Sequence, residues 1–275
     1  MGRITVRRRV TRLRTGYEAV ERPDVLAVEE PLEIRVGGVP LMVTMRTPGD
    51  DVDLVSGLLV AEGVVTAPDE IVSARYCAGS TIEGVNTYNV LDVELTGEAH
   101  ARSMSLARAV TKTSACGVCG KASIDDVTAR GGRDVSGDEL IVDSDFVLSL
   151  PDRLRAGQQV FDKTGGLHAA ALFDGATGEM RTLAEDVGRH NAVDKVIGWA
   201  LRHKSIPLAG HVLQVSGRAS FELVQKAAMA GIPILSAVSA PSSLAAELAT
   251  DRGLTLIGFV RRDSMVVYSR RDRLT

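Results

Sequence analysis

Apolar and polar residues follow two different periods in the first part of the chain. Between residues 31 and 46, two alternating segments flank Gly37 and Gly38, a pattern that predicts a β-hairpin with a two-residue turn. Beyond Asp50, apolar residues recur at helical spacing. This pattern predicts a helix over residues 51–62 that covers the hairpin.

The middle of the chain carries strand-like runs and then loses its period. Residues 71–77 and 87–95 are rich in β-branched and aromatic side chains, which predicts two strands. Cys77 ends the first and is expected to pack as a small apolar residue. Residues 96–113 show no clean period and are predicted to form a mobile connection. A polar, glycine-rich stretch at 131–139 is predicted to be a linker.

Strand-like and helix-like runs alternate after that linker. Ser149 followed by Pro151 predicts a helix start, with a cap and then a proline in the first turn, and the helix is expected to reach about Lys163. Residues 167–185 predict a hairpin around an Asp-Gly-Ala-Thr-Gly turn. Helices are then expected at 187–204, 220–229 and 242–252, and strands at 211–216, 232–238, 254–261 and 265–268. This order predicts an α/β layered domain with a mostly parallel sheet.

Polar stretches stand where the predicted strands end. A mostly parallel sheet binds ligands at the carboxyl ends of its strands, beside the N-termini of helices. Each stretch taken alone is as typical of a helix cap as of a ligand contact. Together they indicate an anionic ligand such as a nucleotide or another phosphate ester. These stretches are 164–166 before His168, 185–195, 216–220 and 239–243.

Composition and charge limit the function classes. The chain has 275 residues, 45% of them hydrophobic, which is enough for a large core. A net charge of −3 argues against a general nucleic-acid binder. No apolar run has the length of a membrane span, and the basic start at residues 3–14 lacks the apolar core of a signal peptide. That basic segment is expected to be a mobile, solvated edge strand or tail, with an anion-binding arm as the alternative. We therefore expect a cytoplasmic protein without membrane or nucleic-acid partners.

Two of the chain's three cysteines, Cys116 and Cys119, form a Cys-x-x-Cys pair flanked by glycines. A helix starting at Gly117 would place both at its N-terminus, where the dipole favours the reactive thiolate. Structural zinc needs further ligands at short spacing, and a zinc deaminase needs a His-x-Glu element, and neither pattern is present. A dithiol redox site and a persulfide-carrying site stay open, and a buried apolar pair is the third reading.

Six motifs in series resemble one known family, the formate dehydrogenase accessory sulfurtransferases (the FdhD family). The resemblance runs from Pro31 to Tyr268. Six motifs in the same order are far more specific than any one of them. The motifs are Cys116-Gly-Val-Cys-Gly, Gly165-Gly-Leu-His-Ala-Ala, Glu185-Asp-Val-Gly-Arg-His-Asn-Ala-Val-Asp-Lys, Ser216-Gly-Arg-Ala-Ser, Ala237-Val-Ser-Ala-Pro-Ser-Ser-Leu-Ala and Gly258-Phe-Val-Arg.

The resemblance implies a fold and a domain organisation. It implies a cytidine deaminase-like layered α/β domain with a mixed sheet and no zinc, together with a smaller N-terminal α+β portion. With the linker as boundary, we expect residues 1–130 to form the N-terminal portion that carries the Cys-x-x-Cys pair. Residues 131–275 are expected to form the cofactor-binding portion.

The resemblance also implies a sulfurtransferase that carries sulfur from a cysteine desulfurase to the molybdenum cofactor, bis-molybdopterin guanine dinucleotide, before its insertion into formate dehydrogenase. Cys116 matches the persulfide position, and Cys119 is expected to hold the sulfur in turn or to resolve the loaded form as a disulfide. A homodimer is also expected. The family's cofactor-binding segment falls on Phe259, Val260, Arg261, Arg262, Asp263 and Ser264. In that segment the two arginines suit phosphate, whereas Asp263 repels it.

Two other function classes compete with sulfur transfer. One is a thioredoxin-like dithiol oxidoreductase that uses Cys116 and Cys119. The other is a nucleotide-binding regulatory module in which the cysteine pair is incidental. A Gly-x-Gly-x-x-Gly after a strand and a P-loop sequence are both missing, so a dinucleotide dehydrogenase and a P-loop NTPase are disfavoured.

Overall fold

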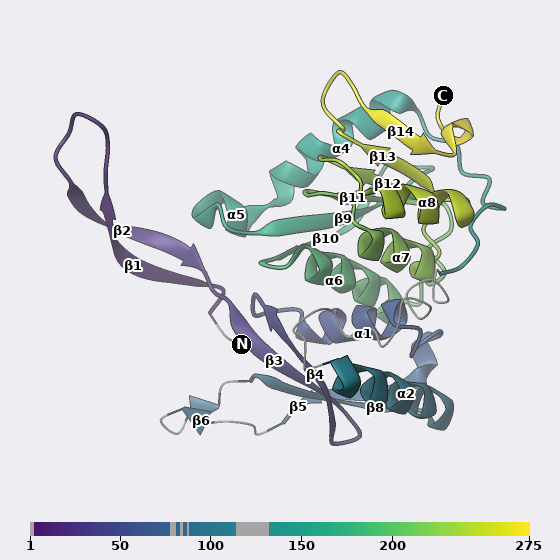
Figure 1. Cartoon of the computed structure of the whole chain (residues 1–275), viewed down its shortest axis with the longest axis horizontal. Helices are drawn as coiled ribbons and strands as arrows, with labels where there is room; N and C mark the ends of the chain where they lie inside the picture. The colour runs from purple at the N-terminus through teal and green to yellow at the C-terminus, as the bar shows by residue number, and fades with distance from the viewer. Residues whose placement is uncertain (1–2, 78–80, 83–84, 87, 114–131) are drawn as a thin grey trace.

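Two β-sheets with helices between them make up the body of the chain (Figure 1). The computed structural model describes residues 3–77, 81–82, 85–86, 88–113 and 132–275. The larger sheet has six strands in the order β10-β9-β11-β12-β13-β14, and the smaller has four in the order β4-β3-β8-β5. This mixed α/β organisation confirms the predicted class, while the cytidine deaminase-like layering stays a prediction.

The predicted hairpin around Gly37 and Gly38 is confirmed as part of the four-stranded sheet. Both glycines have positive φ, which the two-residue turn requires. The sheet is mixed, because β3 pairs antiparallel with β4 and parallel with β8. Its strands are β3 (Glu30–Val36), β4 (Val39–Arg46), β5 (Ile71–Tyr76) and β8 (Val90–Leu95), with a 3-10 turn η1 (Pro68–Glu70) before β5 and a separate ribbon of β6 (Thr81–Ile82) and β7 (Val85–Asn86).

Helices α1 (Asp51–Ala61) and α6 (Arg189–Arg202) join the two sheets, and both were predicted. Their backbones touch at a pair of glycines. A Cβ at Gly57 would lie 1.8 Å from the Asp194 carbonyl oxygen, and one at Gly198 would lie 1.8 Å from that of Asp53. One continuous apolar cluster therefore extends from the small sheet to the large one.

The connection predicted at residues 96–113 is instead helix α2 (Gly97–Thr113), so that prediction was wrong. Ala99, Ser103 and Leu106 are buried at helical spacing, and the helix lies against β4 and β8. Only Leu106 of these is a large apolar residue, and the alanine and serine hide the helical period in the sequence. Packing on the sheet supplies the stability that the pattern did not reveal.

The six-stranded sheet is mixed, and the prediction of a mostly parallel sheet was wrong. Only β11, β12 and β13 run parallel, because only they are joined by crossover helices. The predicted hairpin of β9 and β10 is antiparallel, β9 is also antiparallel to β11, and the last strand, β14, is antiparallel to β13. The strands are β9 (His168–Asp174), β10 (Met180–Asp186), β11 (His211–Val215), β12 (Ile234–Ala237), β13 (Thr255–Gly258) and β14 (Val266–Ser269).

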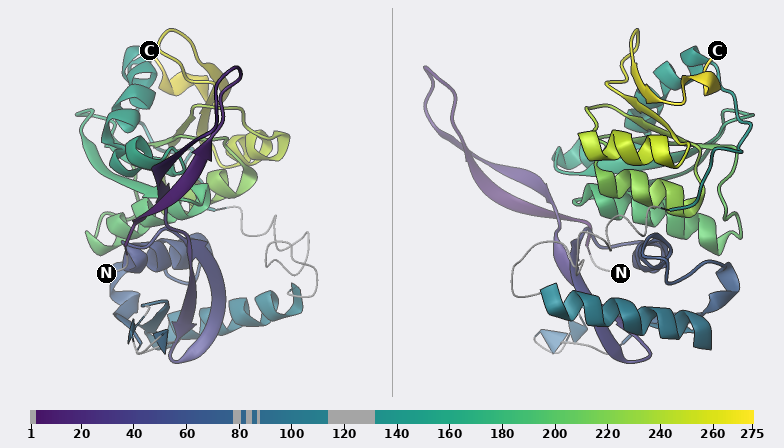
Figure 2. Two further views of the ribbon diagram at one scale, coloured as in Figure 1. Left: turned by 90° about the vertical axis from the view of Figure 1, so that its left-hand side faces the viewer. Right: turned by 45° about the vertical axis from the view of Figure 1, so that its right-hand side comes forward.

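Helices cover both faces of this sheet (Figure 2). Alternate residues of β9 divide between the two faces: Ala170 and Leu172 belong to the cluster that includes α6, α7 (Phe221–Ala230) and α8 (Ser243–Asp251). Phe173 belongs to the second cluster, beneath α4 (Ser144–Gly157). The sheet is thus buried on both faces, and only its edges are free to present polar groups.

The helix predicted to start at Ser149 begins earlier. Asp143 caps α4 by accepting a hydrogen bond from the Asp145 amide at 2.6 Å, so Pro151 lies inside the helix rather than in its first turn. A proline there removes one backbone hydrogen bond, and the packing of α4 on the sheet compensates for it. The helix also ends sooner than predicted, and a separate α5 (Gln159–Thr164) follows.

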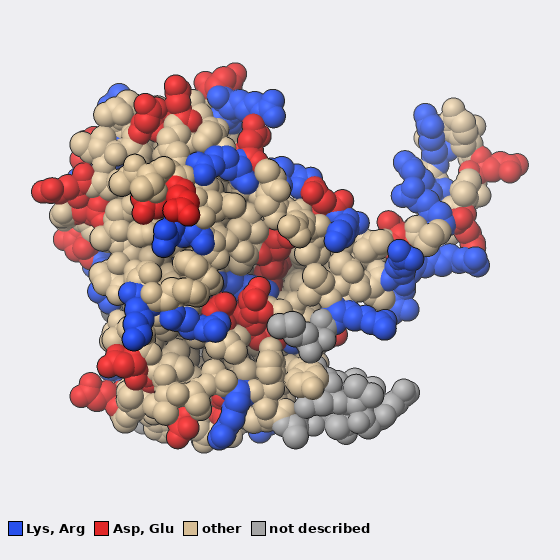
Figure 3. Space-filling model, turned by 180° about the vertical axis from the view of Figure 1, so that it is seen from behind, with Lys and Arg blue, Asp and Glu red and all other residues tan. Residues whose placement is uncertain are grey.

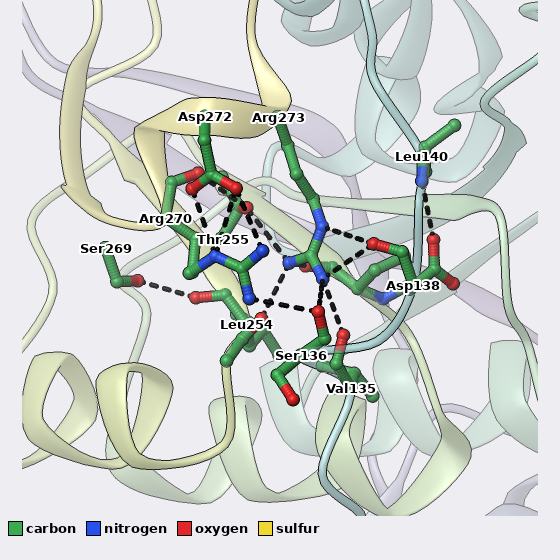
Figure 4. A network of polar contacts seen from close by, with 12 residues as sticks. Val135, Ser136, Asp138, Leu140, Leu254, Thr255, Ser269, Arg270, Asp272 and Arg273 are labelled. Carbon is green, nitrogen blue, oxygen red and sulfur yellow. Dashed lines mark hydrogen bonds and ion pairs between the residues drawn. The ribbon is translucent and has the colours of Figure 1, made fainter.

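Arg273 fastens the C-terminal end of the chain to the segment before α4 (Figure 4). It lies in the 3-10 turn η2 (Arg271–Arg273) and is 2% exposed. Its guanidinium donates to the carbonyl oxygens of Gly253 at 2.6 Å, Val135 at 2.5 Å and Asp138 at 3.0 Å. The buried charge is thus satisfied mainly by backbone carbonyl oxygens, with the Thr255 hydroxyl at 3.4 Å as a further partner.

The basic N-terminal segment is an ordered strand, β1 (Thr5–Arg12), paired antiparallel with β2 (Val20–Ala27). This agrees with the prediction of a solvated edge strand, although its partner β2 was not predicted; the mobility of the segment stays a prediction. The predicted domain boundary near residue 130, and the helix expected at 117–130, lie outside the described residues, and both stay predictions.

Candidate functional site

The polar stretches singled out in the sequence meet at one edge of the six-stranded sheet. Strands β10, β11, β12 and β13 all end there, and β9 begins there. We call this the carboxyl edge, and it comprises residues 164–168, 186–190, 216–220, 238–243 and 259–264. Backbone hydrogen bonds join its loops: the Ser216 amide donates to Ala169, and the Ser239 amide donates to Gly217. The predicted convergence of these stretches is confirmed.

A cavity of about 600 Å³ opens at the carboxyl edge. This volume lies in the range of small-molecule sites. One wall is formed by the strand ends and the other by α4 and α5. The lining residues are Pro151, Asp152, Leu154, Arg155, Gln158, Phe161, Gly165, Gly166, Leu167, His168, Val187, Ser216 and Val238. Sequence reasoning missed the wall from α4 and α5, because nothing in a helix interior marks it as facing a cavity.

His168, Gly217 and Arg189 lie together beside this cavity. A Cβ on Gly217 would lie 3.5 Å from His168 Nδ1 and 3.9 Å from Arg189 Cδ, so the imidazole and the arginine side chain both pass close to Gly217. Burial, with Arg189 adding to it, lowers the pKa of His168. The Arg189 Nε atom is buried and has no hydrogen-bond partner within the described part of the chain. An anionic oxygen at this position would satisfy it.

A second polar group stands at the start of α7. His190 Nε2 lies 3.2 Å from the Ser220 hydroxyl oxygen and 3.6 Å from Glu222 Oε2. The Ser220 side chain makes no capping hydrogen bond to its helix. Burial lowers the pKa of His190, while the Glu222 carboxylate opposes this shift. Neutral imidazole is therefore the favoured form here at neutral pH.

Much of the polar stretch 185–195 supports the fold instead of facing a ligand. Lys195 Nζ lies 2.8 Å from Asp186 Oδ2, and both side chains are buried. Glu185 accepts from the amides of Val160 and Phe161 at the start of α5, at 2.9 and 2.7 Å. Within this stretch, the side chains of Arg189 and His190 are the ones best placed to contact a ligand.

The predicted cofactor segment, residues 259–264, does not line the cavity but contacts two residues that do. Arg262 Nε donates to Asp152 Oδ2 at 2.7 Å, and Arg261 Nη1 lies 3.5 Å from the Val238 oxygen. Asp152 and Val238 both line the cavity. The structure thus places the segment at the carboxyl edge, where the sequence analysis expects a ligand.

The side chains of this segment differ in what they can offer. Phe259 is 40% exposed and has a φ of 52°, a left-handed conformation that turns the chain away from β13. Val260 is 1% exposed and packs beneath α4, so only its backbone can face a ligand. Asp263 accepts from the Ser264 hydroxyl at 3.1 Å, next to Arg262. The arginines are the groups best suited to phosphate.

The predicted reactive pair, Cys116 and Cys119, lies outside the described residues. Cys77, directly after β5, is a free thiol that is partly buried, which agrees with the expectation that it packs as a small apolar residue. Within the described ranges, no cluster of three or more His, Cys, Asp or Glu side chains is arranged to hold a metal ion. A search of the same residues for a helix able to cross a membrane finds none.

Comparison with known proteins agrees with the resemblance read from the motifs. The chain is 56% identical to the sulfur carrier protein FdhD of Streptomyces avermitilis over 100% of this chain and 97% of the relative. It is 54% identical to that of Mycobacterium tuberculosis over the whole length of both.

A solved structure shows the same fold. The crystal structure of a protein described as a formate dehydrogenase accessory protein, from Desulfotalea psychrophila, superimposes with a TM-score of 0.77 at 21% identity, covering 99% of this chain and 100% of that one. The model of the FdhD/NarQ family matches residues 27–275. The chain therefore belongs to the FdhD/NarQ family.

Proposed function

We propose that this protein is a sulfur carrier required for formate dehydrogenase activity. The observation that carries the proposal is the full-length identity of 54–56% to relatives named sulfur carrier proteins. The Cys-x-x-Cys pair at residues 116–119 supplies chemistry that this role needs. A thioredoxin-like oxidoreductase would use the same pair, but the comparisons give that alternative no support.

Loading of the carrier is a thiol exchange. The Cys116 thiolate attacks the outer sulfur of a persulfide on a cysteine desulfurase. A new S–S bond forms on Cys116 as the donor's S–S bond breaks, and the donor cysteine leaves as a thiolate. No net oxidation or reduction occurs, so loading requires only contact between the two proteins.

Release of the sulfur uses the second cysteine. The Cys119 thiolate attacks Cys116 Sγ, a Cys116–Cys119 disulfide forms, and the outer sulfur leaves as hydrosulfide with the electron pair of the broken bond. Hydrosulfide replaces an oxygen ligand of the molybdenum substrate, and this oxygen takes the hydrosulfide proton and one further proton from solvent and departs as water. A cellular dithiol reductant then restores the two thiols.

The acceptor in this proposal is bis-molybdopterin guanine dinucleotide, bound as a substrate at the carboxyl edge. Its phosphates suit Arg189 Nε, which has no hydrogen-bond partner in the described ranges, and the arginines Arg261 and Arg262 next to the cavity. A cavity of about 600 Å³ is large enough to take one nucleotide end. Binding there would hold the acceptor in place for the sulfur-bearing side chain, and proximity would supply much of the rate.

Partners and compartment follow from the same role. We propose a cysteine desulfurase as donor, formate dehydrogenase as the final recipient of the cofactor, and a homodimer as the working form. The reducing cytoplasm keeps free thiols available, which suits a chain with an odd number of cysteines.

The test is sulfur loading followed by mass measurement. The protein is incubated with a cysteine desulfurase and cysteine, and peptide masses are taken. We expect one added sulfur on the peptide that contains Cys116. Loss of two protons without added sulfur would support the oxidoreductase instead.

Two variants complete the experiment in cells. Cys116→Ala should abolish formate dehydrogenase maturation, whereas Cys77→Ala is the matched control and should preserve it. If Cys116→Ala matures the dehydrogenase normally, sulfur transfer through this residue is wrong.

A further inference from the structure

The β1–β2 hairpin, residues 3–27, projects from the body as an arm (Figures 1 and 2). Its strands pair along their whole length, from Thr5 opposite Ala27 to Arg12 opposite Val20. Its contacts with the body gather at its root, where β2 meets α5. The rest of the arm stands in solvent.

An arm of this kind is poorly stabilised by itself. A two-stranded hairpin without a packed face is marginally stable in water. The tip of this arm also exposes apolar side chains: Leu13 is 78% exposed, Tyr17 66% and Val20 58%. Charged residues alone would serve to keep an edge strand from aggregating. Apolar residues at the tip point to a surface that another molecule covers.

The arm carries a charge opposite to that of the body. Its seven arginines against three acidic residues give a net charge of +4, and since the whole chain carries −3, the remainder carries −7. Blue side chains follow the arm in Figure 3. These arginines are Arg3, Arg7, Arg8, Arg9, Arg12, Arg14 and Arg22. Arg9 pairs with Glu21 only at 3.5 Å, with both side chains largely exposed.

The root of the arm lies beside the candidate site. A Cβ on Gly166, which lines the cavity, would lie 3.9 Å from the Ala27 Cβ. Helix α5, which contacts β2, supplies Phe161 to the same cavity. A molecule held by the arm is therefore held next to the carboxyl edge. The match to the family model begins only at residue 27, after the arm.

We infer that the arm is a docking surface for an acidic face of the protein that donates the sulfur. This inference rests on the proposed function, since persulfide exchange requires the donor to touch the carrier. A basic arm attracts an acidic face over a distance and raises the rate of productive encounters. A nucleic acid fits less well, because its charge is continuous and would also meet the negative body.

The test compares two sets of arginine substitutions. Arg7→Gln, Arg8→Gln and Arg9→Gln combined remove three charges from the arm and keep the length of the side chains. The matched control removes three exposed arginines from the body: Arg133→Gln, Arg181→Gln and Arg271→Gln. Each protein is loaded with sulfur by the source organism's cysteine desulfurases, tested one at a time, and separately by inorganic polysulfide, a small donor that needs no docking.

We expect the arm variant to load from the desulfurase about ten-fold more slowly at low salt, with the difference vanishing at high salt. The control should load like the wild type, and polysulfide should load all three proteins equally. Wild-type loading from the desulfurase should itself slow as salt rises, a readout that does not depend on any variant.

Three results would overturn the inference while leaving sulfur transfer intact. The first is an arm variant that the desulfurase loads as fast as the wild type. The second is a wild-type loading rate that does not change with salt. The third is a dimer that becomes a monomer in the arm variant, because a second copy of the chain would then be the partner of the arm. Failure of the proposed function is separate, because the wild type would then take no sulfur from any desulfurase at any salt concentration, whereas polysulfide would still react with its thiols.

Discussion

Replacing Arg273 with methionine should destabilise the protein without altering its chemistry. Arg273 follows β14, at the end of the sheet opposite to the carboxyl edge, and its guanidinium binds backbone oxygens rather than a ligand (Figure 4). Methionine fills much of the same space, so the main loss is of hydrogen-bond donors rather than volume.

The magnitude follows from the oxygens left without that donor. The carbonyls of Gly253, Val135 and Asp138 lose contacts of 2.6, 2.5 and 3.0 Å, and Val135 retains the Asp138 amide at 3.2 Å. A buried acceptor left unsatisfied costs roughly 1–3 kcal/mol, which suggests about 3 kcal/mol in total for the free energy of unfolding. For a chain of this size, that corresponds to a fall in Tm of roughly 6–12 °C.

Thermal unfolding followed by circular dichroism measures this loss directly. Arg273→Lys is the comparison, because it keeps the positive charge but loses the planar fork, and an intermediate Tm is expected. Sulfur loading, assayed well below the Tm, should be unchanged in both variants. A fall in Tm of less than about 2 °C for Arg273→Met would refute the assignment of these hydrogen bonds as a major anchor.

Three further predictions concern the core and the site. Gly198→Ala should lower the free energy of unfolding by roughly 3 kcal/mol or more in urea titration, because its Cβ would lie 1.8 Å from a backbone oxygen; a neutral effect would contradict the close helix contact. Arg189→Gln should weaken GDP binding by roughly 10–100-fold in calorimetry, which is the contribution of one charge-assisted hydrogen bond. The control Arg133→Gln should leave GDP binding unchanged. Equal GDP affinities of the two variants would show that Arg189 is not part of the site. Because the pKa of His168 is lowered in the folded protein, the unfolded chain takes up this proton first as pH falls through about 6.5, and the folded state loses stability on acidification. The Tm of His168→Asn should therefore fall less than that of the wild type between about pH 7.5 and about pH 5.5. An identical fall in Tm would contradict the lowered pKa.

The spacing of apolar residues was enough to predict those helices and strands that bury a regular apolar set. The hairpin around Gly37 and Gly38 and the alternation of β11, α7, β12, α8 and β13 follow from residue spacing alone, since each strand and helix buries a regular apolar set. The meeting of the polar loops that follow β11, β12 and β13 also follows, because parallel strands joined by crossover helices must end on the same side. The loops that flank the β9–β10 hairpin join them because β9 runs antiparallel to β11.

Tertiary packing decided the elements whose pattern was weak. Helix α2 exists because Ala99 and Leu106 find a sheet to cover, although the sequence from 96 to 113 shows no period. Helix α4 runs through Pro151 because its apolar residues lie on the six-stranded sheet. In both cases burial against distant residues outweighs local preference.

The motif series by itself determined the family and the cysteine pair that carries the proposed chemistry, because both are properties of residue order. The tertiary structure alone decided that α4 and α5 wall the cavity and that Lys195 and Glu185 serve the fold. It also decided that Arg189 has a buried nitrogen with no hydrogen-bond partner among the described residues. Whether a polar side chain faces a ligand or a neighbouring strand depends on contacts between residues far apart in the chain, and such contacts leave no local pattern.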